Sequence, residues 1–373
     1  MKKIVFLTGT RADFGKLKSL LAILQDTLDF DPHIFVTGMH LQELYGYTLI
    51  EVERSGFKNI HTFENHTHEA TMDLTLAKTI SGFSQYVKGI APDLIVVHGD
   101  RVEALAGAIV GSLNNVLVAH IEGGEVSGTI DELLRHATSK MSHVHFVSNN
   151  QAKSRLIQMG ELDDAIYTIG SPDVDIMFSD KLPNLDTAKT YYNIPFTTYS
   201  IVMFHPVTTE AADMAFYAEA FVQALIKSGN NYVVIYPNND LGSASILKAY
   251  TCLDVNTRFK LFPSLRFEYF LTLLKHAQSI VGNSSAGVRE APYYGIPVIN
   301  IGTRQQNRVT HSEIINVNYE EELVLEALHR IPTLEVQQQS PVFGAGQSAA
   351  LFLKSLQQGR FWSLNHQKQF RDI

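Results

Sequence analysis

The stretch that decides the fold is residues 94–132, LIVVHGDRVEALAGAIVGSLNNVLVAHIEGGEVSGTIDE. Residues 94–97 are a short, mostly β-branched run, which is typical of a strand covered on both faces, and residues 115–119 repeat this form. Between them, residues 102–113 are rich in Ala, Leu and Gly, as expected of a crossover helix pressed closely on a sheet. The three segments predict a right-handed βαβ unit of a parallel sheet.

Charged residues and glycines follow both predicted strands, in residues 98–101 and 120–125. Ligands of open α/β sheets bind outside the carboxyl ends of the strands, so we expect both clusters to face one crevice. The charged and titratable residues expected there are Asp100, Glu122, Glu125, Asp131, Glu132, Arg101, His98 and His120. Such converging charges suit acid–base chemistry. For Asp100 alone, the alternative is that it only caps the helix that follows.

Composition restricts the class of protein. The 373 residues, 45% of them hydrophobic, can furnish the cores of two α/β domains. A net charge of -8 argues against a nucleic-acid partner, and the single cysteine, Cys252, excludes a disulfide framework or a cysteine zinc site. The apolar run after Met-Lys-Lys is too short for a signal peptide, and no run could span a bilayer, so we expect a cytoplasmic protein with no membrane partner.

The first half of the chain alternates predicted strands and helices. The order is strand 4–7, helix 16–27, strand 33–37, an irregular polar segment 52–68, helix 71–90, the central unit, helix 133–142, strand 143–147, helix 150–159 and strand 167–170. The first turn lacks G-x-G-x-x-G, which disfavours a nicotinamide dinucleotide. Arg11 and Lys16 in or just after this turn could receive an anionic ligand or could simply face solvent.

A histidine-rich segment could suggest a metal site. It contains His61, Glu64, His66, His68 and Glu69. Their spacing matches no recognised ligand pattern, and a mobile loop accounts for their composition. We therefore expect neither a metal site nor any other cofactor.

The second half repeats the alternation after a linker-like segment, 183–197. The predicted strands are 201–204, 232–236, 259–262, 279–281 and 298–301, and the predicted helices are 214–227, 267–276, 320–329 and 348–356. Residues 282–287, GNSSAG, precede a predicted helix and have the composition of a phosphate-binding turn, although an ordinary serine N-cap would look the same. Arg304 and Arg308 after the next strand favour a diphosphate.

We therefore predict two Rossmann-like domains. Residues 1–172 form the first, residues 173–356 form the second, and the tail 357–373 packs back on the first. A cleft between such domains would hold a nucleotide-sugar, with its diphosphate on the second domain and its sugar toward the acids of the first.

Motifs spread over nearly the whole chain resemble those of the hydrolysing UDP-N-acetylglucosamine 2-epimerases, in the family's order. The motifs are residues 9–13 (GTRAD), 98–101 (HGDR), 120–131 (HIEGGEVSGTID), 205–206 (HP), 283–290 (NSSAGVRE) and 302–304 (GTR). The non-hydrolysing relatives carry Pro-Glu after the first Arg and a shorter acid motif. Ala12-Asp13 and the long motif 122–131 are therefore similar to the hydrolysing branch.

This resemblance implies a glycosyltransferase-B-like fold with the active site in the interdomain cleft, a homodimer or homotetramer, and release of UDP and N-acetylmannosamine for sialic acid synthesis. It implies loss of UDP from UDP-N-acetylglucosamine with removal of the C2 proton, giving 2-acetamidoglucal, and then hydration. The catalytic residues it implies are Asp100, Glu122, Asp131, His205 and Arg101. The expected contacts with UDP and sugar are Arg11, Asp13, Lys16, His40, Asn238, Phe270, Ser284, Ser285, Gly287, Glu290 and Arg304.

Within these assignments, Asn238 and Phe270 would contact the uracil, and Glu290 would contact ribose hydroxyls. Which of Asp100, Glu122 and Asp131 takes the C2 proton stays open. Three alternative functions remain: a hydrolysing 2-epimerase acting on UDP-N,N'-diacetylbacillosamine on the legionaminic acid route, a glycosyltransferase of the same fold, and a non-enzymatic nucleotide-sugar sensor.

Overall fold

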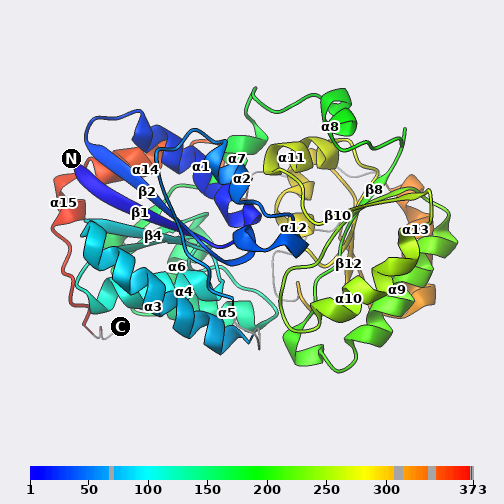
Figure 1. Ribbon diagram of the computed structural model, residues 1–373, viewed down its shortest axis with the longest axis horizontal. Helices are drawn as coiled ribbons and strands as arrows, with labels where there is room; N and C mark the ends of the chain where they lie inside the picture. The colour runs from blue at the N-terminus through cyan, green and yellow to red at the C-terminus, as the bar shows by residue number, and fades with distance from the viewer. Residues whose placement is uncertain (67–70, 306–313, 335–341, 370, 372–373) are drawn as a thin grey trace. The chain divides into compact units, whose positions relative to one another are not determined.

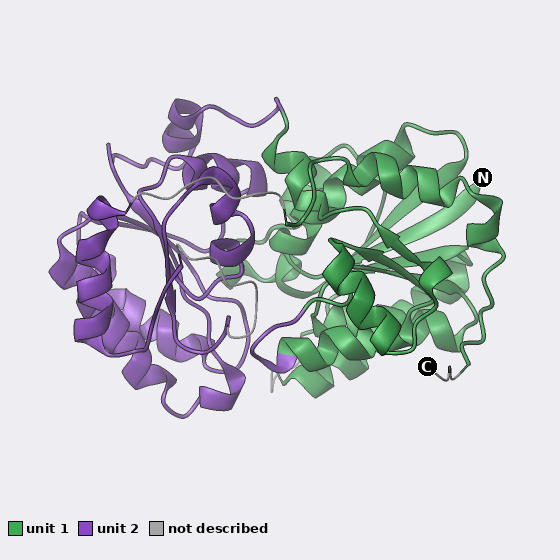
Figure 2. Ribbon diagram, turned by 180° about the vertical axis from the view of Figure 1, so that it is seen from behind, with its two compact units in different colours: residues 1–125, 131–179, 342–373 green, residues 126–130, 180–341 purple. Residues whose placement is uncertain are grey.

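The structure, a computed structural model, describes residues 1–66, 71–305, 314–334, 342–369 and 371. The chain divides into two compact units, each with its own parallel sheet (Figure 2). Unit 1 consists of Met1–Glu125, Asp131–Ser179 and Val342–Ile373, and unit 2 consists of Val126–Ile130 and Asp180–Pro341. Two α/β domains were predicted, and this prediction is confirmed. The predicted location of the site between them stays a prediction.

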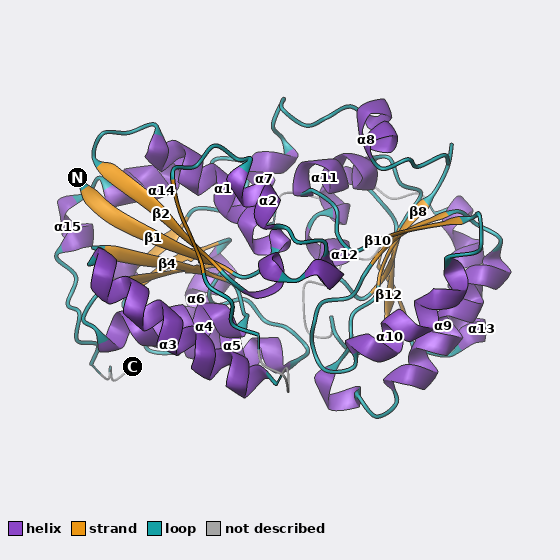
Figure 3. Ribbon diagram, in the orientation of Figure 1, coloured by secondary structure: helices purple, strands orange, loops and turns teal. Residues whose placement is uncertain are grey.

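The described part of unit 1 contains a parallel sheet in the order β3-β2-β1-β4-β5-β6-β7. Strands β2, β1 and β4 of this sheet are labelled in Figure 1. Its strands are β1 (Lys2–Thr8), β2 (Phe30–Val36), β3 (Asn59–Thr62), β4 (Leu94–His98), β5 (Leu117–Ile121), β6 (Val144–Val147) and β7 (Ile166–Thr168). Ile4 and Phe6 pack into one core cluster, and Val5 and Leu7 pack into another. Helices cover both faces of this sheet (Figure 3), which explains why its central strands are apolar at successive positions.

The helices of unit 1 include two from the C-terminal end of the chain. They are α1 (Arg11–Gln25), α2 (Leu49–Glu53), α3 (Met72–Ile90), α4 (Val102–Leu113), α5 (Ile130–Met141), α6 (Asn150–Gln158), α7 (Pro172–Met177), α14 (Ser348–Leu356) and α15 (Gly359–Trp362), with short 3₁₀ helices at Gly38–Leu41, Glu43–Tyr45 and Asp163–Ala165. Phe352 and Phe361 are fully buried in the core, and Trp362 stacks on Phe30. The C-terminal segment thus packs in unit 1.

Unit 2 has a second parallel sheet, in the order β10-β9-β8-β11-β12-β13 among the residues described. Its strands are β8 (Ser200–Met203), β9 (Tyr232–Ile235), β10 (Phe259–Phe262), β11 (Ile280–Gly282), β12 (Val298–Ile301) and β13 (Ile314–Val317). Its helices are α8 (Leu185–Tyr191), α9 (Met214–Ser228), α10 (Ser243–Tyr250), α11 (Phe267–Lys275), α12 (Ala286–Arg289) and α13 (Glu321–Arg330), with 3₁₀ helices at Thr208–Glu210, Thr251–Leu253, Ala291–Tyr294 and Ile331–Thr333.

Several sequence expectations differ from the structure. Residues 52–68 were expected to be irregular, but they include the end of α2 and the edge strand β3, whose polar side chains hide the strand pattern. The linker-like segment contains α8, and α10 and β13 were not anticipated. The chain leaves unit 1 after Ser179, because α7 packs against α1, and it returns at Val342. Residues 173–179 and 342–356 thus lie in unit 1, not in the second domain.

None of the helices in the described ranges is long and apolar enough to cross a membrane.

Candidate active site

The two acid-bearing loops of unit 1 lie side by side. Strands β4 and β5 pair in parallel from Leu94 opposite Leu117 to His98 opposite Ile121, so they end at the same level. The backbone N–H of Gly99 then donates to the carbonyl of Ile121 at 3.0 Å. The structure therefore brings together the loops that begin with Asp100 and Glu122, as the sequence predicted.

Glu122 has an unusual backbone for a residue with a side chain. Its φ is +64°, in the left-handed region, and only 3% of the residue is exposed. This conformation costs about 1 kcal/mol or more, and it persists only where the surroundings enforce it. The Glu122 N–H donates to Phe146 O at 2.9 Å, and Arg135 Nη1 donates to Glu122 O at 2.9 Å. The main chain of this acid is thus held on both sides.

The Glu122 carboxylate lies in a buried network of mixed charge. Lys16 Nζ is 3.4 Å from Oε2, His98 Nε2 is 3.1 Å from the same oxygen, and the Ser171 hydroxyl donates to Oε1. Lys16 Nζ is also 3.0 Å from Asp173 Oδ2. Lys16 was predicted to bind substrate; its ammonium pairs with two carboxylates of unit 1, and the substrate contact stays a prediction. Ser171 and Asp173 were not predicted to belong here, because they lie at the start of α7, distant in sequence from the acid motifs.

Asp100 forms an ion pair with Arg135 of α5. Asp100 is not the N-cap residue of α4, as the alternative required, since that position is occupied by Arg101. Asp131 lies half-buried in the first turn of α5, four residues before Arg135, so both occupy one face of the helix. Sequence reasoning missed Arg135, although its i+4 spacing from Asp131 was a usable signal.

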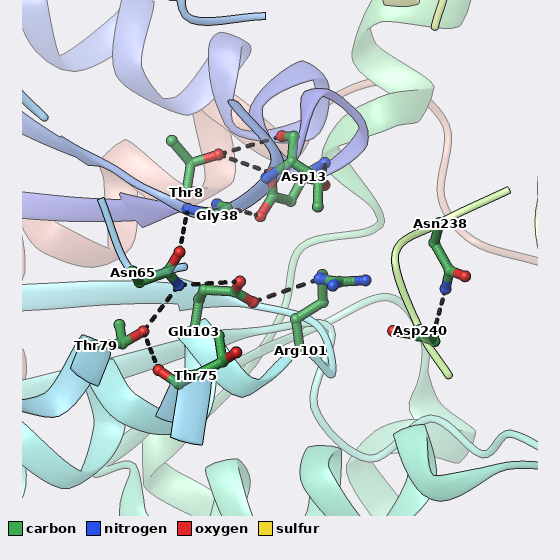
Figure 4. Close-up of polar contacts among 12 residues, drawn as sticks. Thr8, Asp13, Gly38, Asn65, Thr75, Thr79, Arg101, Glu103, Asn238 and Asp240 are labelled. Atoms are coloured by element: carbon green, nitrogen blue, oxygen red, sulfur yellow. Dashed lines mark hydrogen bonds and ion pairs between the residues drawn. The ribbon is translucent and has the colours of Figure 1, made fainter. Parts of the chain in front are cut away.

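The loop after β1 is organised by Asp13. Its carboxylate accepts hydrogen bonds from Thr8 Oγ1 at 2.7 Å and from the N–H groups of Gly9 and Thr10 at 3.0 and 2.9 Å (Figure 4). Together with Thr10 it forms a capping box at the start of α1. The structure thus gives Asp13, predicted to bind substrate, a role in shaping the loop. Arg11 lies beside it in the first turn, 3.5 Å from Glu51.

His40 is a correction to the predicted site. It is 0% exposed, and its ring nitrogens lie 3.1 Å from Thr8 Oγ1 and 2.7 Å from Thr48 Oγ1. Burial lowers the pKa of His40 to about 4, and the nearby Asp13 offsets this effect only in part. A neutral, enclosed imidazole with both nitrogens engaged is not available to a ligand. His40 supports the loop instead.

Arg101 is joined to a polar network that the sequence did not reveal. Its Nε lies 3.4 Å from Glu103 Oε2, and Asn65 Nδ2 lies 3.5 Å from Glu103 Oε1 (Figure 4). Asn65 in turn accepts a hydrogen bond from Gly38 N and donates to Thr79 Oγ1. Glu103 is only 2% exposed, so this buried network fixes the start of α4 and holds the side chain of Arg101 in place.

His205 is held at the end of β8 in unit 2 by two asparagines. Asn283 accepts from the His205 N–H at 2.7 Å and donates to the His205 carbonyl at 2.8 Å. The backbone N–H of Asn238 donates to His205 Nδ1 at 3.0 Å. An imidazole that accepts at Nδ1 carries its proton on Nε2, so His205 is a neutral hydrogen-bond donor.

Other residues of the predicted site lie just after the C-terminal ends of β11 and β12. Arg304 Nη1 donates to the carbonyl of Asn283 at 3.2 Å, and the Gly128 N–H donates to the carbonyl of Arg304 at 3.2 Å. Ser284 lies beside Asn283, 9% exposed, and its hydroxyl accepts from Ala286 N at 3.3 Å. Segment Val126–Ile130 belongs to unit 2, so the long acid motif contributes to both units.

The prediction that residues 282–287 form a phosphate-binding turn stays a prediction. Ser285 is the N-cap residue of α12 and forms no side-chain cap bond, but α12 spans only four residues and has a weak dipole. Gly287 was predicted to belong to this phosphate-binding turn. A Cβ there would lie 2.8 Å from Val298 Cγ1, so this glycine permits α12 to pack on β12. Glu290 and Phe270 are 5% and 7% exposed. Arg308 lies outside the described residues.

In the described residues, no group of three or more His, Cys, Asp and Glu side chains could hold a metal ion. His61 stacks on both Phe35 and Tyr86, and His66 Nδ1 pairs with Gln42 at 2.7 Å. His68 and Glu69 lie outside the described residues.

The chain is similar to known proteins over nearly its whole length. A family model described as UDP-N-acetylglucosamine 2-epimerase matches residues 22–357. A protein of Neisseria meningitidis serogroup B named UDP-N-acetylglucosamine 2-epimerase is 47% identical over 376 residues, covering 100% of both chains. A Legionella pneumophila protein named UDP-N,N'-diacetylbacillosamine 2-epimerase (hydrolyzing) is 31% identical, covering 94% of each chain. The crystal structure of a Neisseria meningitidis UDP-GlcNAc 2-epimerase bound to UDP-GlcNAc superposes with a TM-score of 0.80 at 16% identity, covering 95% of this chain and 99% of that one.

The fold is thus that of the two-domain, glycosyltransferase-B-like α/β proteins. Within that class, the chain belongs to the UDP-N-acetylglucosamine 2-epimerase family.

Proposed function

We propose that this protein is a hydrolysing UDP-N-acetylglucosamine 2-epimerase, which converts UDP-N-acetylglucosamine and water into UDP and N-acetylmannosamine for sialic acid synthesis. The observation that carries the proposal is the acid cluster at the ends of β4 and β5, where the buried Glu122 lies beside Lys16 and His98 and the half-buried Asp100 pairs with Arg135. Epimerisation at C2 requires removal of a weakly acidic proton, which calls for positioned carboxylates.

The proposed reaction has two steps. First, a carboxylate of the cluster takes the C2 proton while the C1–O bond breaks, and UDP leaves with the bonding electrons. The product of this step is 2-acetamidoglucal. Water then adds at C1 while C2 receives a proton on the opposite face, so that free N-acetylmannosamine departs. Asp100, Glu122 and Asp131 are the proposed proton-transfer and charge-stabilising groups, and Arg101 and Arg11 are proposed to neutralise diphosphate charge.

Unit 2 is proposed to bind the UDP. His205 would donate from Nε2–H to a phosphate oxygen, and Arg304 would supply positive charge to stabilise the leaving group. Ser284 and Ser285 would donate their hydroxyls to the phosphates, and Glu290 would accept from ribose hydroxyls. Asn238 and Phe270 are the proposed uracil contacts.

Two lines of support favour the hydrolysing reaction. Ala12-Asp13 and the long motif 122–131 are similar to the hydrolysing branch, and the Legionella pneumophila relative has "hydrolyzing" in its name. Proton NMR of the protein with UDP-N-acetylglucosamine in heavy water tests the proposal. We expect UDP and free N-acetylmannosamine that carries deuterium at C2. Formation of UDP-N-acetylmannosamine without free sugar would assign the non-hydrolysing reaction instead, and release of unchanged N-acetylglucosamine would exclude epimerisation.

The 31% identity to the Legionella pneumophila protein supports a second candidate substrate, UDP-N,N'-diacetylbacillosamine. The two sugars differ at C4 and C6, away from the reacting carbons, so the same acids would serve either one. A side-by-side assay of both UDP-sugars decides between them by kcat/KM.

We also propose that the enzyme is a cytoplasmic homodimer or homotetramer that uses no cofactor or metal. Light scattering after size-exclusion chromatography gives the subunit number directly. A monomer in that measurement, with full activity, would contradict the oligomer.

A further inference from the structure

We propose that Arg135 is a positioning residue for the reaction, a role that rests on the proposed function. Its guanidinium holds the Asp100 carboxylate and the Glu122 backbone in one fixed arrangement. Arg135 Nη2 donates to Asp100 Oδ2, and Nη1 donates to Glu122 O at 2.9 Å. A single side chain on α5 therefore ties together the exits of β4 and β5.

The exposed fractions of the two side chains distinguish the role of Asp100 from that of Arg135. The side chain of Asp100 is 23% exposed, so a ligand can reach it, whereas that of Arg135 is 4% exposed and faces the protein. Arg135 thus acts through Asp100. A guanidinium suits this role because its donors point in fixed directions within one plane, so two acceptors that it binds keep a fixed separation.

The second bond acts on the strained residue of the site. The left-handed backbone of Glu122 aims its carboxylate at Lys16 and His98. Arg135 donates to the carbonyl of this same residue and so opposes its relaxation to an extended backbone. Loss of Arg135 would therefore disturb the positions of both acids at once, and displacements of about 1 Å cost about 100-fold in rate.

Arg155 provides a matched control. It lies on α6, and its Nη1 donates to the Gly124 carbonyl at 3.2 Å, in the same loop. Among the described residues no acid pairs with it. Replacing Arg155 therefore removes support of the loop backbone without removing a partner from a carboxylate.

The test compares Arg135→Gln, Arg135→Lys and Arg155→Gln by steady-state kinetics, with UDP affinity measured by calorimetry. We expect kcat to fall about 100-fold in Arg135→Gln, a smaller loss in Arg135→Lys, and KM and UDP affinity within about threefold of the wild type. Arg155→Gln should keep kcat within about threefold. Equal losses of kcat in Arg135→Gln and Arg155→Gln would overturn the proposal, because general loop support would explain both.

A double-mutant cycle then tests whether Arg135 acts through Asp100. In an Asp100→Asn background, Arg135→Gln should cost less than about tenfold, because the first change already removes the ion pair and only the bond to the Glu122 carbonyl is still lost. Full multiplication of the two losses would overturn the inference. Since removal of one member of a buried ion pair can unfold a protein, circular dichroism accompanies each variant, and Arg135→Lys retains a cation if Arg135→Gln does not fold. If the wild-type enzyme forms no epimerised product, the proposed function is refuted but the coupling between Arg135 and Asp100 is not. The coupling can be measured without substrate, from the unfolding free energies of the wild type, the two single variants and the double variant.

Discussion

Lys16 Nζ lies 3.0 Å from Asp173 Oδ2, joining α1 to the start of α7 inside unit 1. Their side chains are 11% and 2% exposed, and the same ammonium lies 3.4 Å from Glu122 Oε2. One cation thus serves two buried carboxylates. Because charges out of water need partners, this lysine helps both acids to stay ionised in the interior.

The first prediction concerns the stability of this network. Lys16→Met roughly keeps the length of the side chain but removes the Lys16 charge from Asp173 and Glu122, so we expect the free energy of unfolding to fall by about 3–5 kcal/mol. The control is Lys153→Met, which removes an ion pair to Asp163 whose side chains are 30% and 59% exposed and should cost less than about 1 kcal/mol. Denaturant titrations measure both, and equal losses would refute the prediction.

The second prediction separates binding from chemistry. Glu122→Gln is nearly isosteric but cannot accept a proton as a carboxylate does, so turnover should be lost while UDP affinity stays within about threefold. Glu125→Gln is the matched control, because a glutamine oxygen can still accept from Ser148 Oγ, which lies 2.8 Å from the Glu125 carboxylate. Calorimetry with UDP and the heavy-water NMR assay give the two readouts. Surviving turnover in Glu122→Gln would show that the acids are assigned wrongly.

The third prediction is the tautomer of His205. Because the Asn238 N–H donates to Nδ1, nitrogen-15 NMR of the imidazoles should show His205 neutral and protonated at Nε2 at pH 7. Asn238→Ala retains that backbone donor and should retain the tautomer. Asn283→Ala removes both side-chain bonds to the His205 backbone and should broaden or shift its signals. A His205 protonated at Nδ1 in the wild type would contradict this geometry.

The fourth prediction is a pH dependence of stability from Glu161. Burial raises the pKa of this carboxyl, but its hydrogen bonds and charge interactions with His145 and Lys368 outweigh that effect and lower the pKa from 4.5 to about 2. A depressed acid pKa stabilises the fold above about pH 4.5, and this contribution is lost as the pH falls toward 2. It amounts to at most about 3 kcal/mol.

Glu161→Gln should therefore destabilise the protein at pH 7 and have a progressively smaller effect below pH 4.5. Denaturant unfolding of both proteins between pH 7 and 3 measures the difference. Burial lowers the pKa of His145 and Glu161 raises it in part, so Glu161→Gln also removes this second effect and the measured difference reports the coupled pair. A difference in unfolding free energy that stays constant across this range would contradict the assignment. Asp163→Asn, at an exposed carboxylate, is the control.

Much of the fold was predictable because local patterns and sheet packing agree. The apolar runs at residues 94–97 and 298–301 are buried strands, and the Ala- and Gly-rich residues 102–113 are helix α4, with the predicted bounds. The polar edge strand β3 and the short strand β13 were missed, because a strand at the edge of a sheet does not need two apolar faces.

The sequence by itself determined the parallel α/β architecture, the positions of Asp100 and Glu122 at strand ends, and the family, because these depend on local order along the chain. Only the tertiary structure decided which side chains meet. It brought Lys16, Arg135, Ser171 and Asp173 to the acids and enclosed His40 in the interior. The physical reason is that burial requires each charge to find a partner, and those partners come from helices distant in sequence.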